Sequence, residues 1–277
     1  MPVTIASLAV HPVKSTAIRH VTQAHVGPAG LVGDREWMVV DGDGELVSAR
    51  EERALFTVVA DTAATGQNDA DLRLSAPGHP DLEVARPIEG SRDVQMFRSK
   101  HLQGRPAGGE ADAWLRAVLG RDDVSLVWCH APESRRLSVG RESDHAAFQD
   151  GYPVTLLSEA SVRQVHDWTV DAAIERGEEP PTITADRFRP NIVLRGCEPF
   201  EEDDWERVRI GEVTLRRAKL VGRCVMTTID PSDLSGGKDP LRALVRHRRW
   251  DGSTWCAVHH IPESTGVIAV GDEVEVL

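Results

Sequence analysis

The stretch LVGRCVMTTID, residues 220–230, places a thiol directly after a cation. Cys224 follows Arg223, and a neighbouring cation favours the thiolate, which is both the nucleophile and the ligand for soft metals. Three more basic residues lie just upstream: Arg216, Arg217 and Lys219. The stretch therefore predicts a reactive or metal-binding thiol. A small buried residue at the start of a strand is the other interpretation, because free cysteine is often buried.

The segment DRFRPNIVL, residues 186–194, carries arginines suited to an anionic ligand. Guanidinium groups hold phosphate by paired hydrogen bonds. If the segment is extended, side chains two residues apart share a face, which places Arg187, Arg189 and Asn191 together. That face would bind an anion, although surface arginines paired with nearby acids would give the same pattern.

Two N-terminal segments carry further polar residues that fit a phosphate. Lys14 and Ser15 follow a proline in HPVKSTAIRH, and a lysine, a hydroxyl and free backbone N–H groups can together cradle a phosphate. Asp34 and Arg35 lie at the start of a predicted strand in LVGDREWMVVD. Neither segment matches a P-loop or a dinucleotide fingerprint, so the residue types alone also allow ordinary loops.

Sequence motifs for other chemistries are weak or absent. Cys256, His259 and His260 in CAVHHIP are zinc-ligand types, but their spacing is poor for structural zinc and no second cysteine pair accompanies them. The sequence has no G-x-S-x-G or H-E-x-x-H motif. No cysteine spacing fits an iron–sulfur cluster, and no glycine fingerprint fits a bound nicotinamide or flavin. A redox reaction would therefore need electrons from a separate protein.

The elements that must position these residues are mainly short strands. Helical periodicity predicts helices over residues 108–120 and 158–177, the second capped by Ser158 or Ser161. Runs bounded by turn residues predict strands over 4–13, 36–50 (a hairpin), 55–63, 71–76, 82–87, 124–129, 191–196, 205–222, 224–230 and 266–277. The predicted fold class is mixed α+β and mainly β, with a barrel or sandwich. The change from strands to helix sets a domain boundary, which gives residues 1–122 and 123–277.

The composition of the 277 residues is that of a globular protein with a net charge of −12. This charge argues against non-specific binding of nucleic acid and against binding to an anionic membrane. The N-terminus lacks the pattern of a secretory signal, and no apolar stretch approaches the roughly 18 residues that a membrane helix needs. The four cysteines form no C-x-x-C pair, so we expect reduced thiols and a cytoplasmic location.

Several of these segments, in this order, resemble the MOSC family, the C-terminal domain of molybdenum cofactor sulfurase and its relatives. HPVKS and GLVGDREWMVVD resemble the N-terminal β-barrel module of that family. Five later segments resemble the MOSC domain proper: DGYPVTLLSEASV, RFRPNIVLRGCEPFEEDDW, IGEVTLRRAKLVGRCVMTTIDP, DPLRALVRHR and GVIAVGDEVEVL. The likeness covers nearly the whole chain, and it is strongest to the two-module form that includes the mitochondrial amidoxime-reducing component.

The resemblance implies a MOSC-type β-barrel preceded by a β-rich module, with molybdenum cofactor (Mo-molybdopterin) in the cleft between the modules. It implies that Cys224 is the molybdenum ligand and the catalytic residue. The cofactor-binding residues that it implies are Lys14, Ser15, Arg35, Ser158, Arg189, Asn191, Gly222 and Arg223. The implied activity is that of an oxidoreductase, which reduces small N-hydroxylated compounds with electrons from a ferredoxin- or cytochrome-type protein.

Two other functions are compatible with the same resemblance. The cysteine could hold a persulfide for delivery of sulfur, or the protein could carry and store the cofactor without turnover. The sequence also departs from the family at two places. Leu220 and Val221 stand where a Pro-Cys pair is frequent. Trp255 and Cys256 replace an aromatic-glycine pair, so we expect Cys256 at the edge of the cleft.

Overall fold

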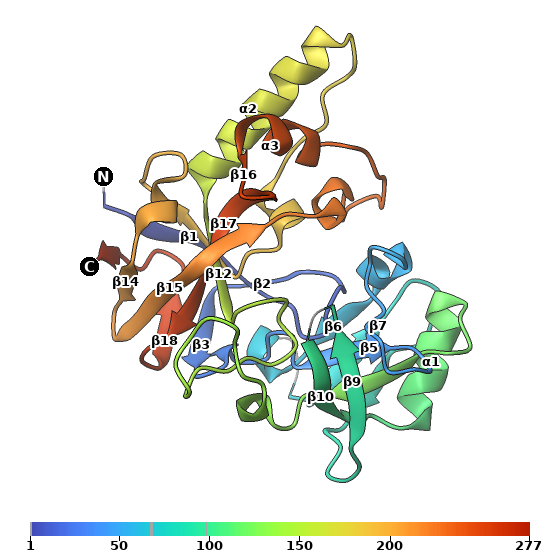
Figure 1. Ribbon diagram of the computed structural model, residues 1–277. Helices are drawn as coiled ribbons and strands as arrows, with labels where there is room; N and C mark the ends of the chain where they lie inside the picture. The colour runs from blue at the N-terminus through green and yellow to red at the C-terminus, as the bar shows by residue number, and fades with distance from the viewer. Residues whose placement is uncertain (1, 67–68, 98) are drawn as a thin grey trace. The chain divides into compact units, whose positions relative to one another are not determined.

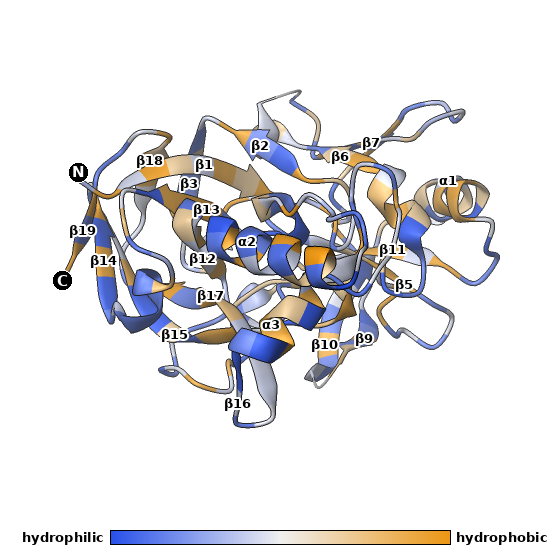
Figure 2. Ribbon diagram, turned by 90° about the horizontal axis from the view of Figure 1, so that it is seen from above, coloured by the Kyte–Doolittle hydropathy of each residue, from blue (hydrophilic) through white to orange (hydrophobic). Residues whose placement is uncertain are grey.

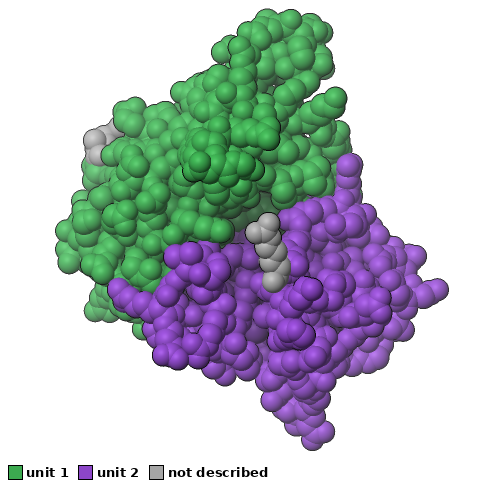
Figure 3. Space-filling view, in the orientation of Figure 1, with its two compact units in different colours: residues 1–9, 22–27, 154–277 green, residues 10–21, 28–153 purple. Residues whose placement is uncertain are grey.

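Strands make up most of the regular structure of the computed structural model (Figure 1), which describes residues 2–66, 69–97 and 99–277. The chain forms two compact units, coloured separately in Figure 3. The first unit contains Met1–Ala9, Thr22–Gly27 and Val154–Leu277, and the second contains Val10–Val21 and Pro28–Pro153. The second unit is thus inserted between parts of the first. The predicted boundary after residue 122 was drawn from the order of the elements, and it stays a prediction.

A long sheet organises the first unit, with strand order β19-β14-β15-β17-β12-β13-β1. Its strands are β1 (Thr4–Val10), β12 (Val154–Ser158), β13 (Ile192–Arg195), β14 (Arg207–Ile210), β15 (Val213–Gly222), β17 (Ser253–Pro262) and β19 (Val274–Val276). β12 and β13 are parallel, whereas the other neighbours in this order are antiparallel. Three further strands belong to this unit: β3 (Gln23–Gly27), which pairs with β18 (Gly266–Ala269), and β16 (Arg249–Trp250), which pairs with β17.

Helix α2 (Glu159–Glu175) connects the parallel strands β12 and β13, as a parallel pair requires. Its buried residues recur at helical spacing, namely Val162, Val165, Thr169 and Ala173. Figure 2 shows the resulting mixture of apolar and polar bands along α2. The apolar side packs into a core cluster with Phe188, Val221, Leu244 and Cys256. Leu244 comes from α3 (Leu241–His247), a short helix that follows Pro240.

The second unit has two smaller antiparallel sheets, in the orders β5-β11-β10-β9 and β6-β7-β8. The strands of this unit are β2 (Arg19–Val21), β4 (Gly30–Leu31), β5 (Trp37–Val40), β6 (Val59–Asp61), β7 (Leu72–Ser75), β8 (Leu82–Val84), β9 (Arg92–Met96), β10 (Ser99–Pro106) and β11 (Ser125–Trp128). Helix α1 (Gly109–Leu119) ends at Gly120, whose φ of 65° is the left-handed conformation of a helix C-cap. A second core cluster, in this unit, contains Met38, Val94, Val127 and Phe148.

The prediction of a mainly β chain with some helix is confirmed, and both predicted helices are present. Two local predictions are wrong, and one helix was missed. Residues 224–230 are not a strand, because Val225–Thr228 form a 3-10 helix. Residues 55–57 belong to the 3-10 helix Arg53–Thr57 rather than to the following strand. Helix α3 was not predicted. In the part of the chain that the structure describes, no helix is both long and apolar enough to cross a membrane.

Candidate functional site

Cys224 lies where β15 has ended and a short 3-10 helix begins. Its carbonyl oxygen accepts hydrogen bonds from the backbone N–H of Thr227 at 3.2 Å and from the Thr227 hydroxyl at 3.0 Å. The hydroxyl of Thr228 donates to the Val225 carbonyl at 2.7 Å. Threonine hydroxyls that bond to carbonyls three residues back compete with strand formation. This explains why a run rich in β-branched residues turns instead of extending.

The four cysteines differ in their surroundings. Burial raises the pKa of the Cys129 and Cys256 thiols to about 12. Burial, helped by the nearby Glu202 carboxylate, raises the pKa of Cys197 to about 11. These three thiols are therefore protonated at neutral pH, whereas Cys224 is a half-exposed cysteine that follows an arginine. Burial thus disfavours thiolate chemistry at Cys129, Cys197 and Cys256.

The Arg223 side chain, just after the end of β15, is fixed by bonds to two main-chain carbonyl oxygens. Its Nε donates to the Cys256 carbonyl at 2.7 Å and its Nη1 donates to the Phe188 carbonyl at 3.0 Å. The guanidinium also lies 5.3 Å from the centre of the Phe188 ring. These contacts hold the residue before Cys224 in one orientation. Two of the upstream cations are paired with acids, Arg216 with Glu263 and Arg217 with Glu206.

The expectation that Arg187, Arg189 and Asn191 share one face of a strand is wrong. Ala185–Phe188 form a 3-10 helix, and Arg189 has a left-handed backbone with φ of 51°, so the alternation of an extended chain does not apply. Arg187 is buried and its Nη2 donates to Asp230 at 2.6 Å.

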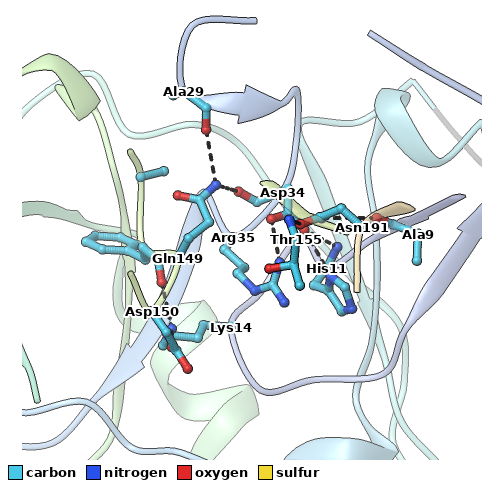
Figure 4. Close-up of polar contacts among 12 residues, drawn as sticks. Ala9, His11, Lys14, Ala29, Asp34, Arg35, Gln149, Asp150, Thr155 and Asn191 are labelled. Carbon is cyan, nitrogen blue, oxygen red and sulfur yellow. Dashed lines mark hydrogen bonds and ion pairs between the residues drawn. The ribbon is translucent and has the colours of Figure 1, made fainter. Parts of the chain in front are cut away.

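Asn191 holds strands of its own unit together (Figure 4). Its side-chain oxygen accepts from the Thr155 N–H at 3.1 Å, and its Nδ2 donates to the Ala9 carbonyl at 3.2 Å. The residue is buried, and its backbone also bonds to both Thr155 and Ala9. The side-chain amide is therefore used by the fold, which favours an indirect role at any site nearby.

Ser158 and Gly222, two other implied cofactor residues, have clear local roles. The Ser158 hydroxyl accepts from the Ser161 N–H at 3.0 Å and caps α2, and the residue is fully buried. Gly222 is the last residue of β15 and is exposed. A Cβ atom at Gly222 would lie 3.7 Å from the Trp255 ring, which is ordinary contact distance.

In the second unit, Lys14 is a buried cation with two oxygen partners (Figure 4). Its ammonium group donates to the Phe148 carbonyl at 2.7 Å and to the Asp150 carboxylate. Burial lowers the pKa of Lys14 to about 8, although Asp150 opposes this shift. Lys14 therefore loses its charge in a pH range that experiments can reach. The next residue, Ser15, is buried and has a φ of 70°.

Asp34 organises a second charged group in the same unit (Figure 4). Its Oδ1 accepts from the His11 backbone N–H at 2.9 Å and lies 3.0 Å from the His11 ring Nδ1. Its Oδ2 accepts from Arg35 Nη1 at 2.6 Å. Burial favours the neutral acid, but Arg35 and His11 outweigh it and hold the pKa of Asp34 well below its usual range. Asp34 is thus an anion that fixes Arg35.

Three of the implied cofactor residues share an unusual backbone. Ser15, Arg35 and Arg189 have φ values of 70°, 53° and 51°. This conformation is costly for residues with a side chain and persists where the surroundings impose it, often at ligand sites. The sequence alone gave no sign of this shared feature.

The structure also bears on the predictions for Cys256 and for the candidate zinc ligands. Cys256 is fully buried in the core of its unit, so its thiol is not exposed, and its expected place at the edge of the cleft stays a prediction. His259 contacts the Thr155 hydroxyl at 3.2 Å. Within residues 2–66, 69–97 and 99–277, no group of three or more His, Cys, Asp or Glu side chains is arranged to hold a metal ion. The zinc interpretation therefore has no support.

Sequence reasoning missed Asp150 as a partner of the predicted site. Asp150 and its partner Lys14 are 136 residues apart along the chain, and Asp150 precedes a glycine as in an ordinary turn. His11 was missed for a similar reason, because its contact with Asp34 depends on the fold. No local pattern in the sequence would have revealed either contact.

Comparison with known protein families agrees with this arrangement. Residues 2–122 match the MOSC N-terminal beta barrel domain, and residues 143–275 match the MOSC domain. The chain belongs to the MOSC family. Like the resemblance in its sequence motifs, both matches lie in the order expected for a two-module MOSC protein.

Several curated relatives of this MOSC protein have names that describe an activity. The mitochondrial amidoxime-reducing component 1 of Xenopus laevis is 32% identical, over 98% of this chain and 81% of that protein. The mouse (Mus musculus) protein of the same name is 32% identical, over 99% of this chain and 82% of its own length. The bovine (Bos taurus) mitochondrial amidoxime reducing component 2 is 32% identical, over 98% of this chain and 82% of its own length.

Proposed function

We propose that this MOSC protein binds molybdenum cofactor and reduces N-hydroxylated compounds with electrons from a separate donor protein. The names of its relatives support an amidoxime-reducing activity. The observation that carries the proposal is Cys224, a half-exposed thiol beside a fixed arginine, in a chain whose other three thiols are held protonated. A soft thiolate is a suitable ligand for such a metal.

The residues of the chain fit this cofactor to different degrees. Cys224 fits the metal. The cationic and polar residues that fit the phosphate and the pterin are Lys14, Ser15, Arg35, Arg189 and Arg223, three of which have the left-handed backbone typical of ligand sites. Ser158 and Asn191 fit a supporting role, because their side chains are bonded within the fold. Gly222 contributes space rather than a polar group.

The reaction requires that the N–O bond of the substrate break while two electrons and two protons enter, which releases an amine and water. The bound cofactor would supply the redox chemistry of that step. The contribution of the chain is to position the cofactor and to tune its chemistry. Arg223 holds the start of the Cys224 turn, and Asp34 keeps Arg35 oriented. The electrons must come from outside, because no sequence motif for a flavin, nicotinamide or iron–sulfur centre is present.

Metal and pterin analysis of the purified protein tests this proposal first. We expect stoichiometric molybdenum and pterin, turnover of benzamidoxime with a reduced viologen, and no turnover with NADH alone. Bound cofactor without turnover would support the storage function instead. A persulfide on Cys224 without molybdenum would support the sulfur carrier.

The cellular setting of the protein also stays a proposal. A cytoplasmic location and a ferredoxin- or cytochrome-type donor are what we expect, whereas the curated relatives have the word mitochondrial in their names. Fractionation of the native host, followed by capture of the reduced donor on immobilised protein, would test both. Recovery of the protein in a membrane or organelle fraction would contradict the expected location.

A further inference from the structure

A β-hairpin next to Cys224 presents two tryptophans. In it β16 pairs with β17, with Arg249 opposite Thr254 and Trp250 opposite Ser253. The two turn residues, Asp251 and Gly252, have φ values of 50° and 74°, as in the type I′ turn that suits a tight hairpin. The hairpin backbone therefore has a regular conformation, which fixes the positions of the two tryptophans.

The indole rings of this hairpin are held in place. The Trp255 Nε1 donates to the Trp250 carbonyl at 3.0 Å, which satisfies its polar group, and the ring centres lie 6.3 Å apart. The Arg248 guanidinium lies 4.8 Å from the centre of the Trp250 ring and bonds to Asp203. Trp250 is 40% exposed and Trp255 is half-buried, so aromatic surface faces solvent.

Trp255 lies across from Gly222, which is two residues before Cys224. Gly222 is the cross-strand partner of Trp255, and a Cβ atom at Gly222 would lie 3.7 Å from the ring. The Arg223 side chain points the other way, towards core residue Phe188. The Arg223 N–H donates to the Thr254 carbonyl at 2.7 Å, one residue beyond β15, and Cys224 has extended backbone with φ of −130°. Because side chains alternate along an extended chain, we expect the Cys224 side chain on the side of Gly222 and Trp255. Gly222 is exposed and places no side chain against the ring.

We propose that Trp255, supported by Trp250, forms an aromatic wall beside the thiol and selects planar, delocalised N-hydroxylated substrates such as aromatic amidoximes. Flat π-systems stack on indole rings, which adds affinity that a small substrate such as hydroxylamine does not gain. This inference rests on the proposed function, because it assigns a specificity residue to the same site. It makes Trp255 a binding residue and gives it no part in electron or proton transfer.

Kinetics of the cofactor-loaded protein on two substrates test the wall. Trp255→Leu should lower kcat/KM for benzamidoxime about tenfold more than kcat/KM for hydroxylamine, mainly through KM, because stacking is lost. Trp255→Phe, which keeps an aromatic face, should recover most of the difference. Trp168→Leu is the matched control, since Trp168 is also half-buried but stacks on His247 of α3, at a ring distance of 4.3 Å. That control should affect both substrates equally.

Binding of benzamidine, which is planar and needs no reductant, provides a second test that is independent of turnover. Saturation-transfer NMR on the loaded protein should show weaker binding to Trp255→Leu than to wild type or Trp168→Leu. Equal benzamidine binding and an unchanged substrate ratio would overturn the wall, even if the wild type reduces both substrates. If the wild type reduces neither substrate, the proposed function fails, and the benzamidine comparison alone decides whether the wall exists.

Discussion

Three proposed cofactor-binding cations are held in different ways in the two units: carboxylates hold Lys14 and Arg35, whereas main-chain carbonyl oxygens hold Arg223. In the second unit, Lys14 faces Asp150 and Arg35 faces Asp34, so each cation has a carboxylate partner. In the first unit, Arg223 donates from its Nε to the Cys256 carbonyl and from its Nη1 to the Phe188 carbonyl. Ion pairs respond to pH and to loss of a partner, whereas bonds to main-chain carbonyls mainly fix an orientation.

The largest effect on stability should follow removal of Asp34. Its side chain is 0% exposed, and Asp34→Ala removes the carboxylate that accepts from the buried His11 and from the half-buried Arg35. Breaking a buried charge pair from one side costs about 3–5 kcal/mol. The free energy of unfolding in urea, measured at neutral pH, should fall by that amount.

An exposed ion pair provides the control for Asp34→Ala. Arg209 and Glu275 bridge β14 and β19, with side chains 50% and 53% exposed. Glu275→Ala should change the unfolding free energy by less than about 1 kcal/mol. Equal losses for the two variants would show that Asp34 is not the buried anchor that its contacts indicate.

A smaller, pH-dependent effect should come from Lys14. Its pKa is lowered to about 8 by burial, so its positive charge is present below that pH and is lost as the pH rises through it. Affinity of the protein for sulfate, which does not itself titrate in this range, should fall about tenfold as Lys14 deprotonates, because a charge-assisted contact disappears.

Two variants sharpen the assignment of this pH dependence. The other charged groups that act on Lys14 are Asp150, Arg35 and Arg135. Asp150→Asn removes a carboxylate that raises the pKa of Lys14, so the loss of affinity should shift to lower pH. Lys14→Met should bind sulfate weakly at every pH. A pH profile of Lys14→Met that matches wild type would contradict the role of Lys14.

The smallest expected effect is that of Ser158→Ala. Loss of the α2 cap should cost about 1 kcal/mol in the free energy of unfolding, while Ser161 and Glu202 keep their own contact at 2.7 Å. Molybdenum and pterin content should stay close to that of wild type. A stable variant that loses its cofactor would show that Ser158 binds the cofactor directly, as the resemblance implies.

Helices α1 and α2 were predictable because periodicity and termination signals agree along one stretch of chain. Helix α2 has its cap at Ser158 and its buried residues at helical spacing, and α1 stops at Gly120. The strand predicted over residues 224–230 failed because hydroxyls of Thr227 and Thr228 bond back to the main chain. Local β-propensity does not register such competing hydrogen bonds.

The candidate site was predictable by residue type but not by contact. Lys14, Arg35 and Cys224 stood out because of their chemistry and their motifs, yet the carboxylate that balances Lys14 lies 136 residues away. Only the fold brings Trp255 opposite Gly222 on the neighbouring strand. Single-sequence patterns report short-range order, so pairings across sheets and loops stayed hidden.

The most direct test of the central claim is activity per bound molybdenum in Cys224→Ala. The control is Cys197→Ala, another half-exposed cysteine, whose thiol burial and Glu202 keep protonated. Molybdenum, pterin and viologen-driven benzamidoxime reduction would be measured on wild type and both variants. We expect Cys224→Ala to keep much of its pterin through the remaining cationic residues but to lose nearly all activity per molybdenum, while Cys197→Ala stays close to wild type. Equal activity per molybdenum in Cys224→Ala and wild type would contradict the thiolate-ligand account.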